Sequence, residues 1–92
     1  MDKREEILNE AKTCVCGDRD KSYGKPEDNF DRIAGLWQAY LGVRITKFDV
    51  AAMMILMKMA RIKATGGEHR DSWVDAAGYA ACGGSMVKLP FE

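Results

Sequence analysis

The apolar stretch at residues 48–62 constrains the fold more than any other part of this chain. Only Asp49, Lys58 and Arg61 are polar within it. Its apolar residues follow one another over a length that exceeds an ordinary strand, so they indicate a helix. Its longest uninterrupted apolar run, residues 50–57, is far shorter than a membrane span requires.

Capping signals bound this helix at both ends. Thr46, followed three residues later by Asp49, forms a capping signature, and Thr65-Gly66-Gly67 stops the helix and reverses the chain. Because the helix is apolar on nearly every side, we expect it to be central and surrounded. Four methionines cluster in it, and we interpret them as adaptable core filler rather than as a binding surface: Met53, Met54, Met57 and Met59.

Three further helices are expected. Residues 3–14 form a short amphipathic helix, residues 26–41 start at Pro26 and end before Gly42, and the last helix starts at Asp71 or Ser72 and runs to the glycines at 83 and 84. The small residues of this last helix favour close packing on the preceding helix or on a symmetry mate. The sequence therefore predicts an all-α, four-helix bundle-like domain spanning residues 1–92, with a central antiparallel helical hairpin.

Composition limits the class of protein. The chain has 92 residues with 14 basic and 14 acidic side chains, so it lacks the basic field that nucleic-acid binding requires. A chain this short buries little surface, so we expect a homo-oligomer. Three cysteines without a C-x-x-C pair, with His69 as the single histidine, suggest neither a disulfide framework nor zinc. With no apolar signal region, we expect a protein of the bacterial cytoplasm without membrane contact.

The densest polar cluster surrounds the start of the last helix. Asp71 and Asp75 are one helical turn apart, the spacing that lets two carboxylates share Mg²⁺. The antiparallel hairpin brings Lys58 and Arg61 near them, and these cations with a carboxylate-held metal could bind phosphate oxygens. Two structural alternatives stay open. The four side chains can form inter-helix ion pairs, and Ser72 with Asp75 matches a capping box.

His69 and the segment before residue 26 offer weaker signals. His69 could act as a general base or contact phosphate, although a histidine in a polar turn is more often exposed or capping. Tyr23-Gly24, preceded by Arg19 and Asp20, could form a lid, and the favoured alternative is a turn whose tyrosine covers the edge of the core.

Three segments carry a resemblance to known proteins: RDKSYGKPEDNFDRIAGLW, DVAAMMILMKMARI and HRDSWVDAAGYAAC. Over residues 19–82 the chain resembles a family of small phage and prophage proteins of unknown function. More distantly, the last helix is similar to the second acidic motif of the MazG-type all-α nucleoside triphosphate pyrophosphohydrolases, where Asp75 would match the motif's aspartate. The glutamate-rich E-E-x-x-E motif of those hydrolases has no counterpart here, because the preceding helix carries Lys58 and Arg61 instead.

Two functional hypotheses follow. In the first, which the resemblance implies, the protein binds a nucleotide or phosphate as a Mg²⁺-dependent pyrophosphohydrolase would. Asp71 and Asp75 hold the metal and act in catalysis, and Lys58, Arg61 and His69 contact phosphate. In the second, the protein is a non-catalytic oligomeric interaction module acting on a host protein or signal.

Overall fold

The structure is a computed structural model that describes residues 2–17 and 24–90. Within these ranges it contains four α-helices and no strand: α1 (Lys3–Cys16), α3 (Pro26–Leu41), α4 (Lys47–Ala64) and α5 (Arg70–Ser85). The all-α prediction is confirmed, and each expected helix is present with ends shifted by a residue or two. The interpretation of Tyr23, Arg19 and Asp20 lies outside the described residues. In the described ranges no helix is long and apolar enough to cross a membrane.

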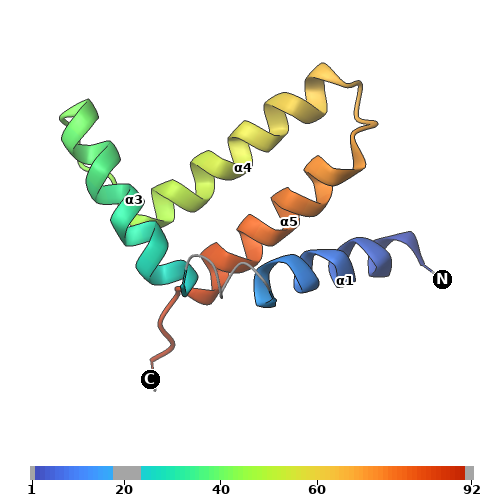
Figure 1. Cartoon of the computed structure of the whole chain (residues 1–92), viewed down its shortest axis with the longest axis horizontal. Helices are drawn as coiled ribbons and strands as arrows, with labels where there is room; N and C mark the ends of the chain where they lie inside the picture. Colours follow the sequence, from blue (N-terminus) through green and yellow to red (C-terminus); the bar gives the residue numbers. More distant parts are fainter. Residues whose placement is uncertain (1, 18–23, 91–92) are drawn as a thin grey trace.

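The predicted antiparallel hairpin of α4 and α5 is the centre of the fold (Figure 1). Thr46 accepts a hydrogen bond from the backbone N–H of Asp49, and the Asp49 carboxylate accepts one from the Thr46 N–H, which completes the expected capping box of α4. After α4, Gly66 and Gly67 take φ values of 63° and 86°. Glycine adopts this left-handed backbone without strain, so the chain reverses there.

One buried cluster joins the helices. Its fully buried members Phe30 of α3 and Val50 of α4 pack with Cys82 of α5 and with Met86 just beyond it. Val15 at the end of α1 packs against the same cluster. Helices α1 and α3 both reach this cluster, and within the described ranges the side of the hairpin that carries Leu56 and Met59 stays exposed. Figure 1 shows the far end of α3 projecting away from the hairpin.

The prediction that residues 48–62 are surrounded is wrong for the single chain. The helix is central, since α4 packs on both α3 and α5, but Leu56, Met57 and Met59 are exposed. The interpretation of the methionines as core filler fails for the same reason, and only Met54 packs against the buried cluster. Two neighbouring helices cannot enclose a third one, so part of the α4 surface stays exposed.

Candidate functional site

The hairpin brings two of the predicted site residues into direct contact. The Lys58 ammonium lies 2.8 Å from a carboxylate oxygen of Asp75, which makes an inter-helix ion pair. The Lys58 side chain is 14% exposed and the Asp75 side chain is 41% exposed. A largely buried ammonium requires a partner, and Asp75 supplies it. The ion-pair alternative is therefore confirmed for these two residues.

The capping-box alternative for Ser72 and Asp75 is wrong. Helix α5 begins at Arg70, with His69 as its N-cap residue, so Ser72 is already inside the helix. Its side chain is fully buried, and its hydroxyl makes a 2.7 Å hydrogen bond with Nδ1 of His69. This bond fixes the imidazole of the half-buried His69 against the hairpin turn. Apart from the three-residue spacing of His69 and Ser72, no sequence pattern predicts this hydrogen bond.

Arg61 and Asp71 stay at the surface. Both side chains are exposed, and within the described ranges neither takes part in a hydrogen bond or ion pair of its side chain. The same ranges contain no group of three or more His, Cys, Asp or Glu side chains able to hold a metal ion. Asp71 and Asp75 alone therefore leave a Mg²⁺ site short of ligands from this chain.

Two other ion pairs tie the flanking helices to the hairpin. Lys47 at the start of α4 pairs with Glu27 of α3, and Arg70 at the start of α5 pairs with Glu10 of α1. Hydrogen bonding to Lys47 lowers the pKa of the Glu27 carboxyl below its usual value, and hydrogen bonding to Arg70 does the same to the pKa of Glu10. These pairs lie at the surface, so each contributes little to the free energy of unfolding. Their main effect is to orient α1 and α3 relative to the hairpin.

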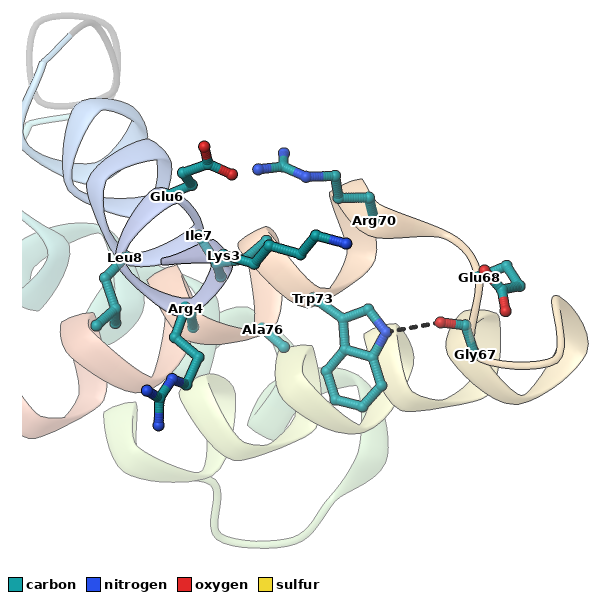
Figure 2. A pocket seen from close by; sticks show the side chains of 11 residues that line it. Lys3, Arg4, Glu6, Ile7, Leu8, Gly67, Glu68, Arg70, Trp73 and Ala76 are labelled. Carbon is teal, nitrogen blue, oxygen red and sulfur yellow. Dashed lines mark hydrogen bonds between the residues drawn. The ribbon is translucent and has the colours of Figure 1, made fainter. Parts of the chain in front are cut away.

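A groove of about 850 Å³ lies between α1 and the start of α5. Trp73 forms part of its wall, and its indole N–H donates a 3.0 Å hydrogen bond to the carbonyl of Gly67 in the hairpin turn. Figure 2 shows Glu6 and Arg70 pointing toward each other at one rim, with Arg4 on the far side. The Trp73 side chain is 44% exposed.

The uncovered side of the hairpin is the largest feature that sequence analysis missed. On α4, exposed apolar side chains recur at spacings of four, four and three, which places them on one side of the helix. On α5, the matching side carries small residues and Trp73. We call this surface the open face; it comprises Phe48, Ala52, Leu56 and Met59 of α4 and Trp73, Ala76, Ala80 and Gly84 of α5.

Two glycines of α5 let it approach its neighbouring helices closely. A Cβ added at Gly83 would lie 3.1 Å from the Cβ of Ala51, so α5 approaches α4 closely at this position. The predicted close packing of the last helix on the preceding one is confirmed. On its other flank α5 meets α1, where a Cβ added at Gly78 would lie 3.0 Å from Val15. Ala80 and Gly84 lie outside both contacts, whereas Trp73 and Ala76 also line the groove beside α1.

The fold and its surfaces define a small all-α protein built on a helical hairpin with one uncovered apolar side. Residues 6–87 match the family described as a domain of unknown function, DUF6378, and the chain belongs to this family. It is 50% identical over 88 residues to the Gene 55 protein of Mycobacterium phage D29, an alignment that covers 96% of this chain and 58% of that protein.

A second relative is the Gene 55 protein of Mycobacterium phage L5, which is 49% identical over 75 residues, or 80% of this chain and 47% of that protein. The chain thus spans about half the length of these curated relatives. No solved structure matches it. The predicted resemblance to small phage proteins of unknown function is confirmed.

Proposed function

We propose that the protein is a non-catalytic helical interaction module whose working surface is the open face. The observation that carries this proposal is the row of Phe48, Leu56 and Met59, which are large apolar side chains exposed on one side of α4. Large contiguous apolar surface on a small protein marks a protein–protein interaction site.

The shape of the chain supports the proposal. Its accessible surface is 6754 Å², whereas a compact monomer of 10.3 kDa exposes about 5,400 Å². Its radius of gyration of 14.3 Å also exceeds the roughly 12 Å that is typical of this length. A chain that exposes this much surface gains stability when a partner covers it.

Two methionines on α4 provide an internal test. Met59 belongs to the open face and is 45% exposed, whereas Met57 lies outside the open face and is 55% exposed. Hydroxyl-radical footprinting of the protein in the lysate of the cells that produce it would compare their oxidation. We expect Met59 to be oxidised at least threefold more slowly than Met57. Equal rates would mean that nothing covers the open face, and the proposal would be wrong.

A second candidate function is phosphate or nucleotide binding at the hairpin end, as in the MazG-type pyrophosphohydrolases. Arg61 supports it, because this exposed guanidinium has no carboxylate partner within the described ranges and lies on the hairpin arm that ends beside His69. In this version Arg61, His69 and Lys58 contact phosphate, and Asp71 and Asp75 hold Mg²⁺. The remaining metal ligands would come from a second copy or from the substrate.

The direct assay of this second candidate is pyrophosphate release from a panel of nucleoside triphosphates with Mg²⁺. Asp71→Asn is the informative variant, because within the described ranges the Asp71 carboxylate forms no ion pair, whereas Asp75→Ala also removes the partner of Lys58. Release that Asp71→Asn abolishes would support the candidate. No release across the panel, together with no nucleotide-induced thermal shift, would eliminate it.

A further inference from the structure

We infer that the open face is covered by a second copy of this chain, so that two α4–α5 hairpins stack face to face as a four-helix bundle. This inference rests on the proposed function, because it names the partner of the same surface. Three observations support it: the area that the chain exposes in excess, the pattern of large and small side chains, and the register of the hairpin.

The excess area has the size of a dimer interface. The chain exposes about 1,400 Å² more than a compact monomer of its mass. A standard interface buries about 800 Å² on each partner, and permanent homodimers bury about 1,000 Å² or more. One isologous interface of this size would therefore account for more than half of the excess surface.

The side chains of the open face are complementary to themselves. The α4 row is mostly large, with Phe48, Leu56 and Met59, and the α5 row is small after Trp73, with Ala76, Ala80 and Gly84. Large residues pack best against small ones, which also let helix backbones approach closely. A second copy offers both rows at once, provided that its α5 lies across α4 of the first copy.

A two-fold axis parallel to the hairpin produces this arrangement. Rotation about such an axis places α4 of each copy against α5 of the other, with neighbouring helices antiparallel, as in an up-and-down bundle. Within the chain, the Lys58–Asp75 pair and the Ala51–Gly83 contact show which residues of α4 and α5 lie at the same height along the hairpin. A two-fold axis parallel to the hairpin preserves this height, so the same residues of α4 and α5 lie opposite each other between the two copies.

This register predicts specific contacts. Leu56 of one copy lies level with the turn between Ala76 and Ala80 of the other, and Met59 lies near Trp73, where a thioether packs well against an indole. Phe48 lies against Gly84 of the other copy. All these residues come from the open face, so α1, α3 and the ion pairs of the hairpin end keep their places.

The test compares two matched leucines. Leu56 on the open face is 65% exposed and Leu36 on α3 is 66% exposed, so aspartate at either position is equally tolerated by a single chain. Sedimentation equilibrium should give twice the chain mass for the wild type and for Leu36→Asp. For Leu56→Asp it should give the single-chain mass at the same concentration, with helicity checked by circular dichroism. A wild type that is monomeric at 100 μM, or a Leu56→Asp dimer, would overturn the inference.

A cross-linking experiment tests the arrangement even if Leu56→Asp fails to fold. Leu56→Cys and Ala80→Cys chains, each also carrying Cys14→Ser and Cys16→Ser, are treated separately and mixed with a short bifunctional maleimide. We expect the cross-linked dimer to be several-fold more abundant in the mixture. Cross-linking of Leu56→Cys alone at the same level would place α4 against α4 and contradict the arrangement. Protection of Met59 in lysate combined with a monomeric purified protein would reject the second copy and leave the proposed function standing.

Discussion

The ion pair between Lys58 and Asp75 should respond asymmetrically to mutation. Asp75→Ala leaves the Lys58 ammonium without its carboxylate in a position that is only 14% exposed. Exposed ion pairs contribute about 0–1 kcal/mol, whereas removing one partner of a buried pair costs about 3–5 kcal/mol. Because this pair is half-buried, we expect Asp75→Ala to lower the free energy of unfolding by about 1–2 kcal/mol.

Lys58→Met should cost less than Asp75→Ala. Methionine retains most of the packing of the lysine stem, and the Asp75 carboxylate, which is 41% exposed, can be solvated when its partner is gone. We expect a loss of about 0–1 kcal/mol, and the double variant should be more stable than the sum of the two losses implies.

Urea unfolding followed by circular dichroism measures these differences at one fixed protein concentration, because partner binding makes stability depend on concentration. A difference of about 1 kcal/mol corresponds to a melting-temperature shift of roughly 4–8 °C in a domain of this size. Asp71→Ala, which removes an exposed carboxylate one turn away, is the control and should change stability by no more than about 0.5 kcal/mol. Equal losses for Asp75→Ala and Lys58→Met, with full additivity, would refute the reasoning.

Three further predictions concern the core, the helix cap and the response to acid. Phe30 is fully buried at the junction of α3 with the hairpin, so Phe30→Ala should cost about 3–5 kcal/mol in urea unfolding. Thr46→Ala removes one half of the capping box of α4 and should cost about 1 kcal/mol, with a Thr46→Ser control restoring most of it. The pKa of Glu27 is lowered by Lys47 and that of Asp49 by hydrogen bonds from Thr46, so these groups contribute stability above their unfolded pKa values, and this contribution is lost as the pH falls through the folded ones. The melting temperature should therefore fall below about pH 4.5. We expect a less steep fall with pH in Glu27→Gln, and an unchanged pH dependence of the melting temperature in that variant would contradict the assignment.

Local signals made most of the fold predictable. The capping box at Thr46 and the glycine pair at 66 and 67 determine the backbone conformation over only a few residues. They therefore located the start of α4 and the hairpin turn correctly. The N-terminus of α5 was harder to locate, because Ser72 matches a capping pattern and yet its hydroxyl bonds His69 from inside the helix. Both roles suit a serine near a helix start.

The candidate site was only partly predictable. Helical spacing and the hairpin turn were enough to place Lys58 near Asp75. They did not indicate whether Lys58 or Arg61 would pair with the Asp75 carboxylate and which of the two would stay exposed. The open face was missed because an apolar residue on a helix indicates burial without saying what buries it. Among the described helices, α3 and α5 pack on α4, and together they leave Leu56, Met57 and Met59 exposed.

Contact between Leu56 of one chain and Ala80 of another is the most direct test of the central claim. An isotope-filtered nuclear Overhauser experiment on a mixture of labelled and unlabelled protein detects only contacts between chains. We expect cross-peaks between the methyl groups of Leu56 and Ala80 in that experiment. Their absence, or cross-peaks that instead connect Leu36 or Leu8 to the other chain, would contradict it.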